Sequence, residues 1–136
     1  MTDKLNFSLV SPAREMFSGQ VDHVIAPGSE GEFGVLPEHA PFMSTLRSGR
    51  LRIIDGDVVH RFFVHGGFAD VTPEGLTVLA EEAIRLEDLN EEGIRHSIAE
   101  AERAADAAKD QAARFKAEGD VRRFRAQLEA LDEAHH

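Results

Sequence analysis

The sequence contains no cysteine, no tryptophan and no tyrosine among its 136 residues. The absence of cysteine excludes a disulfide framework and any metal site built on thiolates. It also suits a reducing cytoplasm. Basic residues are in the minority, with a formal net charge of −10 and no run of lysine and arginine. That balance argues against binding to nucleic acid through a positive surface field.

Long apolar runs and targeting signals are also missing. No run approaches the roughly 20 apolar residues that a membrane-spanning helix needs. The start of the chain, residues 1–5, has no basic region followed by an apolar core and does not resemble a secretory signal. We therefore expect this chain to reach a membrane only through a partner.

Proline and glycine are scarce in the C-terminal part of the chain, and the composition changes near residue 87. All five prolines and nine of the eleven glycines lie at or before Gly75, while twelve alanines follow Asp88. Turn formers dominate the first part and helix formers the second. The composition thus predicts two domains, residues 1–87 and residues 88–136. Both are acidic, with formal charges of −6 and −4.

Short apolar segments recur along the first of these domains. Leu5, Phe7 and Leu9 alternate with polar residues as in a half-buried strand. Residues 55–57, Asp-Gly-Asp, lie between two apolar runs and predict a tight hairpin. Further strands are expected over residues 17–26, 42–46, 51–54, 58–64, 68–71 and 76–80. About eight to ten strands with no intervening helix favour an antiparallel β-sandwich or a flattened barrel.

The second domain follows a helical period instead. Apolar residues recur at alternating steps of four and three, at Ile94, Ile98, Ala101, Ala105, Ala108, Ala112 and Phe115. A second stripe starts at Val121, and Gly119-Asp120 between the stripes predicts the end of one helix and the cap of the next. We expect an α+β chain, mainly β, that ends in an antiparallel two-helix hairpin. Its alanine seam buries little apolar area, so the hairpin should be marginally stable alone.

Residues 28–41 concentrate three glycines, two prolines, three glutamates and a histidine. Such a composition predicts a shaped, exposed loop between strands, where function tends to be located. Its glutamates, Glu30, Glu32 and Glu38, could pair as an acid and a base. A chain without tryptophan or tyrosine nevertheless offers little support for a sugar-cleaving site.

The remaining residues contain no motif for catalysis or for a metal ion. His60 and His65 flank an apolar strand without the ligand spacing of a zinc site. There is no phosphate-binding glycine loop, and Ser44 and Ser48 lie in no nucleophile-elbow sequence. We therefore expect no catalytic residue, no metal ion and no cofactor in this chain.

Several segments resemble the epsilon subunits of bacterial F-type ATP synthases. They are residues 17–19, 28–41, 63–71 and 77–83, together with Leu46 before Gly49, in the order and at the spacing of that family. The match over residues 28–41 is long enough to be specific, and the division into two parts agrees as well. The resemblance implies a non-catalytic subunit of the central stalk, which couples proton translocation through the c-ring to ATP synthesis in the catalytic head.

The resemblance also implies partners and positions. The N-terminal domain would bind the gamma subunit and the c-ring, as a peripheral subunit at the cytoplasmic face of the bacterial inner membrane. Carried over by position, Glu32 and His39 match residues implicated in the c-ring contact. Glu30, Gly31 and Gly34 would shape that surface.

The C-terminal helices of many family members inhibit ATP hydrolysis. Here Arg122, Arg123 and Arg125 form a basic cluster that could meet acidic residues of the alpha and beta subunits or remain a solvated face.

ATP-binding members of the family carry Ile/Leu-Asp-x-x-Arg-Ala at the start of the first helix. This chain has Asn90, Gly93 and Ile94 at the Asp, Arg and Ala positions of that motif. Loss of the arginine removes a cation that would pair with phosphate, so we expect weak or absent ATP binding.

Two other interpretations stay open from the residues alone. The first is a free-standing β-sandwich that binds a ligand and uses its helices to oligomerise. Co-purification separates this module from a stalk subunit. A stalk subunit should bring a gamma-like partner in near-equal amounts, whereas the module should self-associate. The second is a solitary hydrolase, which would require turnover by the isolated chain.

Overall fold

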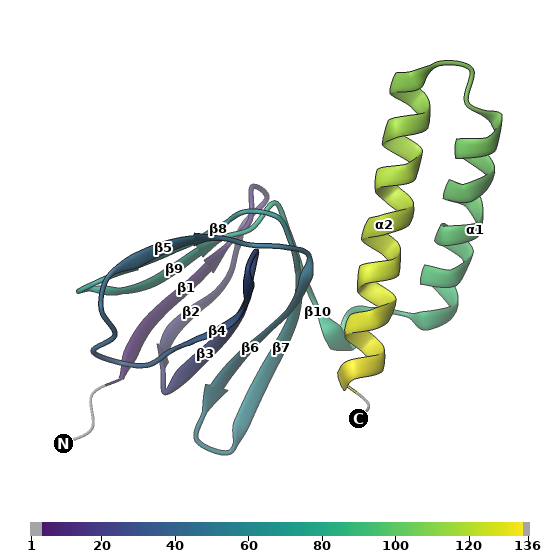
Figure 1. Cartoon of the computed structure of the whole chain (residues 1–136). Helices are drawn as coiled ribbons and strands as arrows, with labels where there is room; N and C mark the ends of the chain where they lie inside the picture. Colours follow the sequence, from purple (N-terminus) through teal and green to yellow (C-terminus); the bar gives the residue numbers. More distant parts are fainter. Residues whose placement is uncertain (1–3, 135–136) are drawn as a thin grey trace. The chain divides into compact units, whose positions relative to one another are not determined.

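A computed structural model describes residues 4–134 (Figure 1). The chain divides into two compact units, one ending at Arg85 and the other beginning at Leu86. Within the described residues no helix is long and apolar enough to cross a membrane.

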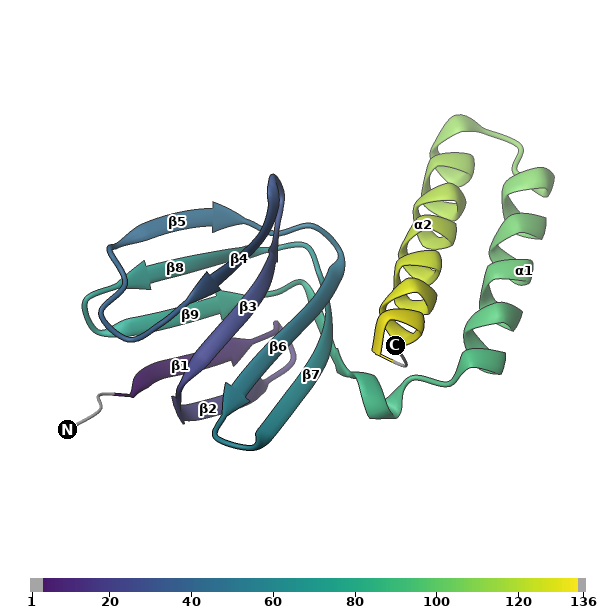
Figure 2. The same cartoon turned by 60° about the horizontal axis from the view of Figure 1, so that its bottom comes forward.

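The first unit contains ten strands in two five-stranded sheets, which Figure 2 shows as two layers. In spatial order, the β1 sheet consists of β2 (Glu15–Val21), β1 (Leu5–Val10), β9 (Gly75–Leu79), β8 (Phe68–Thr72) and β5 (Phe42–Thr45). The β6 sheet consists of β10 (Glu82–Arg85), β7 (Val58–His65), β6 (Gly49–Asp55), β3 (His23–Gly28) and β4 (Gly31–Val35). The predicted β-sandwich is confirmed. Among the described residues each sheet ends in edge strands, so the two sheets do not join into a closed barrel.

One pair of strands departs from the expected antiparallel arrangement. β1 and β9 pair in parallel, with Phe7 opposite Leu76 and Leu9 opposite Val78. Strands joined by a short turn must run in opposite directions, as β6 and β7 do. β1 and β9 are far apart in the chain, so no turn dictates their relative direction.

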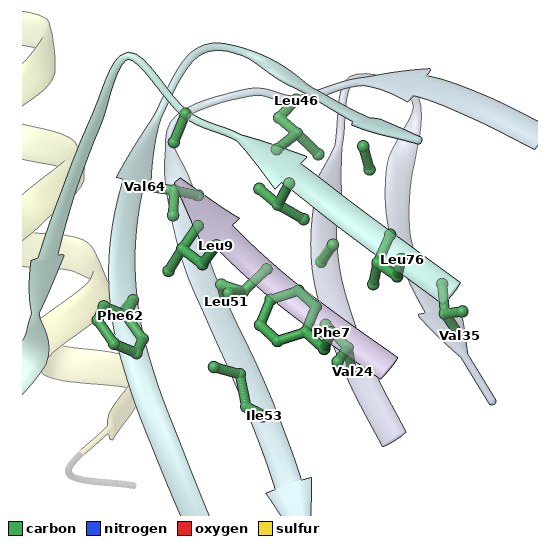
Figure 3. Close-up of a cluster of buried hydrophobic side chains, with 14 of the residues drawn as sticks. Phe7, Leu9, Val24, Val35, Leu46, Leu51, Ile53, Phe62, Val64 and Leu76 are labelled. Atoms are coloured by element: carbon green, nitrogen blue, oxygen red, sulfur yellow. The ribbon is translucent and has the colours of Figure 1, made fainter. Parts of the chain in front are cut away.

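The core lies between the two sheets and is built from the inward-facing residue of each pleat (Figure 3). Phe7 and Leu9 of β1 are buried, as their alternation predicts, and they pack with Leu51, Ile53 and Phe62 from the β6 sheet. The latter three are completely buried. Burial of each such side chain contributes about 1.5–3 kcal/mol.

Two glycines allow the strands to turn where the sequence suggested. Gly56 has φ 60° in the Asp-Gly-Asp hairpin between β6 and β7, and its amide N–H donates to Asp22 at 2.7 Å. Gly67 has φ 101°, and a Cβ atom there would lie 1.9 Å from the carbonyl oxygen of Leu79. Only glycine fits at that corner.

The second unit begins with a short 3₁₀ turn, Leu86–Asp88, and continues with α1 (Glu91–Ala107) and α2 (Gln111–Ala134). The two helices lie side by side and antiparallel in Figures 1 and 2, so the predicted helical hairpin is confirmed.

The predicted break at Gly119-Asp120 is wrong, because both residues lie within α2. α1 instead ends where Ala108 adopts an extended conformation, with ψ 132°. Asp110 then accepts a hydrogen bond from the amide of Ala113 at 2.7 Å and caps the start of α2. The side chain of Asp120 pairs with Lys116 at 3.4 Å along the helix surface and is not used as a cap.

Candidate functional site

Residues 28–41 do not form the single loop that their composition predicts. Residues 31–35 form the edge strand β4, which is hydrogen-bonded to β3 through a tight turn. Phe33 and Val35 point toward the core, and Val35 is fully buried. This period of two is hidden in the sequence by the surrounding glycines and glutamates. Only residues 36–41 remain as a loop between β4 and β5.

The predicted contact residues lie along this edge strand and are not gathered at one point. Glu30 and Gly31 lie at the turn before β4, Glu32 and Gly34 lie on the strand, and His39 lies in the loop after it. At about 3.3 Å per residue, β4 separates its two ends by roughly 13 Å. Any partner that touches all five residues must therefore run along the strand.

Glu32 is held by a cation from another strand. Arg52 on β6 donates from Nη2 to the Glu32 carboxylate at 2.9 Å, reaching across the intervening strand β3. Arg52 is 27% exposed and Glu32 is 46% exposed at the side chain. The contact orients the carboxylate and leaves it accessible from the outer face of the β6 sheet. The sequence pattern does not reveal Arg52, because the pairing depends on the spatial order of the strands.

Gly34 lies directly under a histidine ring. A Cβ atom at Gly34 would come within 2.6 Å of Nε2 of His23 on β3. A larger residue at this position would displace the ring from the surface of β4. Gly34 thus shapes the surface beside Glu32 through His23.

The loop after β4 is anchored by aromatic contacts and by one strained residue. The His39 amide donates to the Leu36 carbonyl at 3.2 Å, which closes a turn through Pro37 and Glu38. Glu38 has φ 67°, in the left-handed region. The His39 ring packs on Phe42 with a centroid distance of 5.3 Å. These contacts fix the direction in which the loop presents its side chains.

The start of α1 uses its residues for helix capping. The side chain of Asn90 accepts a hydrogen bond from the Gly93 amide at 2.7 Å, and Ile94 is buried. Asn90 and Gly93 thus stabilise the first turn. Because Gly93 has no side chain, this position offers no cation to a ligand at the first turn.

Three of the arginines of α2, at positions 122, 123 and 125, do not act as one cluster. Arg125 pairs with Glu102 of α1 at 2.8 Å, and the Arg123 guanidinium stacks on Phe124 at 4.5 Å. Arg122 is exposed. In this arrangement Arg125 stabilises the hairpin itself, while Arg122 faces solvent.

Ser48, His65 and Glu81 form a further polar group, which no sequence pattern predicts. The Ser48 hydroxyl lies 2.5 Å from Nδ1 of His65, and Nε2 of that ring lies 4.0 Å from the Glu81 carboxylate. These contacts join the ends of three segments of the sandwich. Among the described residues, no group of three or more histidine, cysteine or acidic side chains converges to hold a metal ion.

Comparisons with known proteins cover both units of the chain. Residues 4–86 match the family model of the ATP synthase delta/epsilon chain β-sandwich domain. The ATP synthase epsilon chain of Maricaulis maris is 50% identical over 126 residues, covering 93% of this chain and 95% of that protein. The epsilon chain of Hyphomonas neptunium is 72% identical over 95 residues, covering 69% of this chain and 70% of that protein.

A solved structure extends the comparison to the whole chain. It is a chain in the cryo-EM structure of the Euglena gracilis mitochondrial ATP synthase with OSCP, F1 and c-ring in rotational state 1. The match has a TM-score of 0.79 at 25% identity, and covers 100% of this chain and 84% of that chain. The similarity therefore includes both the sandwich and the helices.

Proposed function

Because this chain belongs to the ATP synthase delta/epsilon chain family, we propose that it is a central-stalk rotor subunit that couples proton flow through the c-ring to ATP synthesis. As an epsilon chain it is a stalk subunit of the complex and not the catalytic one. The observation that carries the proposal is the full-length likeness to a chain of an assembly that contains F1 and a c-ring. In this role the sandwich binds a gamma subunit and the c-ring. The chain is then peripheral, at the cytoplasmic face of the inner membrane.

The contact surface for the ring follows strand β4. Glu32, held by Arg52 at 2.9 Å, supplies an oriented carboxylate, and His39 supplies a ring fixed against Phe42. Gly31 and Gly34 add no side chain beside them, and Glu30 adds a second exposed carboxylate at the turn before β4. A flat edge strand with one oriented charge suits a partner that lies along it.

A charge reversal tests this surface. Glu32→Arg should uncouple proton pumping from ATP hydrolysis in inverted membrane vesicles, while ATPase activity persists. Glu15→Lys, on the exposed edge strand β2, is the matched control and should leave pumping unchanged. The double swap Glu32→Arg with Arg52→Glu should fail to restore pumping, because the partner meets the reversed charge. Normal pumping with Glu32→Arg would contradict the assignment.

The helical hairpin is proposed to restrain ATP hydrolysis by meeting the alpha and beta subunits. Arg122 and Arg125 lie one helical turn apart and could face acidic residues of the catalytic head. For Arg125 this requires release from Glu102, so the pair favours the closed hairpin. Glu102→Gln should therefore lower the ATPase rate of the complex if Arg125 contributes to inhibition. An unchanged rate would leave Arg125 a structural residue.

Binding of ATP to the hairpin is proposed to be weak or absent. Asn90 caps α1, and position 93 offers only a backbone amide that already donates to Asn90. Calorimetric titration of the isolated chain with ATP should detect no micromolar binding. Micromolar affinity would overturn this proposal.

A further inference from the structure

Two arginines lie side by side on the outer face of the β6 sheet. Arg52 of β6 and Arg61 of β7 are directly opposite each other in the antiparallel register. Their Cα atoms are therefore about 4.5–5.5 Å apart, and their side chains project from the same face. Figure 2 shows the two strands next to each other. We call these two residues the arginine pair. Like charges directly opposite each other destabilise a sheet.

The chain supplies only one carboxylate for these two cations. Glu32 accepts a hydrogen bond from Nη2 of Arg52 at 2.9 Å. Within residues 4–134, Nε of Arg52 is buried without a hydrogen-bond partner, and the exposed Arg61 has neither an ion-pair nor a hydrogen-bond partner. Although acidic residues outnumber basic ones by 25 to 15 in the sequence, the arginine pair keeps an uncompensated positive charge.

Apolar side chains surround the arginine pair on the same face. Ile25 of β3 lies opposite Arg52, and Ile54 lies opposite Val59 two residues further along β6 and β7. These three apolar residues are half-buried. An ion pair among apolar side chains is screened less by water and salt than a fully exposed one. The face therefore favours a partner segment that carries an acidic side chain among apolar ones.

Arg61 lies beyond the surface that we assign to the c-ring. Strands β3 and β6 separate β7 from β4. Because neighbouring strands are about 4.7–4.9 Å apart, Arg61 lies roughly 14 Å from the strand that carries Glu32. A partner confined to β4 does not reach it. The proposed function gives the sandwich a second partner, the gamma subunit, which can occupy this part of the face.

We propose that a carboxylate of the gamma subunit binds between Arg52 and Arg61, with apolar side chains of that subunit on the surface around the pair. The inference rests on the proposed function, which supplies this partner. Arginine binds carboxylates through charge-assisted, often paired hydrogen bonds, and Arg52 keeps donors for a second acid because Glu32 bonds only to Nη2. An anionic membrane surface is a poorer match, because the net charge of −10 and the neighbouring Glu32 carboxylate oppose it.

Photo-crosslinking in the assembled ATP synthase identifies the occupant. The photo-reactive residue p-benzoylphenylalanine replaces Val59, which lies two residues from Arg61 on the same face. We expect attachment to a gamma peptide that has an aspartate or glutamate within a few residues of the crosslink. The same probe at the exposed Arg14, in the turn before β2, is the control and should not capture that peptide. Attachment to the c-ring, to the helices of this chain, to a second copy or to lipid, or no attachment, would overturn the proposal.

A charge reversal tests the arginine pair itself. Arg61→Glu should weaken binding of the full chain to ATP synthase depleted of it by about tenfold or more at low salt, with a smaller effect at high salt. In the isolated chain the same change places an acid opposite Arg52, so its melting temperature should not fall. Arg14→Glu makes the same change of charge at an exposed turn and should leave binding unchanged.

A compensating change in the partner completes the test. Exchange of the captured acidic residue of gamma for arginine should recover part of the affinity that Arg61→Glu removes. Undiminished binding of the Arg61→Glu chain, or a loss that the exchange does not reverse at all, would overturn the proposal. The proposed function would survive either result, because proton pumping with Glu32→Arg tests it separately.

Discussion

The sandwich and the helical hairpin reach stability by different means. The sandwich buries large side chains between two hydrogen-bonded sheets, and Leu9, Leu51 and Phe62 are completely excluded from solvent. The buried positions of the helices include Ala101 and Ala117, which remove much less apolar area from water. The sandwich is therefore suited to a fixed contact, and the hairpin to a change of arrangement at low cost.

The largest effect should come from a cavity in the sandwich. Phe62→Ala removes a fully buried ring and should lower the free energy of unfolding by about 3–5 kcal/mol. Chemical denaturation followed by circular dichroism measures this loss. The matched control is Met43→Ala on β5, a residue that is 65% exposed, with an expected change within about 0.5 kcal/mol. A loss below about 1 kcal/mol at Phe62 would remove the contrast between the two units.

Loss of a helix cap should cost the hairpin less. Asp110→Ala removes the acceptor for the Ala113 amide and should destabilise α2 by about 1 kcal/mol. Hydrogen exchange should then rise in α2 and stay constant in the strands. Asp106→Ala, in the last turn of α1, is the control and should not increase exchange, because an acid there opposes the helix dipole. Equal acceleration in the strands would contradict the independence of the two units.

A glycine substitution sharpens the placement of the helix break. Gly119→Ala should stabilise α2 by up to about 1 kcal/mol, since alanine favours a helix interior. The new Cβ atom meets only the Arg122 side chain, at 3.7 Å. Thermal melting followed at 222 nm gives the sign of the change. Destabilisation would instead support a break at Gly119.

The smallest effect concerns the ion pairs of Lys4, just before β1, with Asp22 and Asp55. The contacts with Asp22 and Asp55 raise the pKa of Lys4, and the Lys4 contact together with the Gly56 amide lowers the pKa of Asp22. The Asp22 contribution is therefore present above the ordinary aspartate pKa and is lost on acidification through the folded value. The Lys4 contribution is lost only as the pH rises through its raised value. Lys4→Met should lower the free energy of unfolding slightly at pH 7 and leave it unchanged at pH 2. Chemical denaturation at the two pH values measures this difference.

Much of this fold follows from local patterns. The alternation of Phe7 and Leu9 predicts β1, and the Asp-Gly-Asp turn predicts the hairpin around Gly56. The sequence does not predict strand β4, because its inward residues, Phe33 and Val35, stand among glycines and glutamates. The helix break was misplaced because Gly119 and Asp120 also fit a helix interior, and the alanine stripe continues past Ala108.

The candidate site depended more on position in space than on local pattern. The resemblance pointed to Glu32 and His39, but Arg52 became visible only once β3 was found between β4 and β6. A cleft at one end of the sandwich brings together Leu36, Val71 and Glu74, which are far apart in the chain. No local spacing relates such residues, because the packing of the two sheets brings them together.

In the proposed function, the sandwich alone couples the rotor and the hairpin only modulates it. The direct measurement is ATP synthesis driven by a proton gradient in membrane vesicles that carry the full chain, a chain ending at Glu87, or no chain. We expect the shortened chain to sustain synthesis like the full chain, and vesicles without the chain to make no ATP. Loss of synthesis with the shortened chain, while it remains bound to the complex, would contradict it.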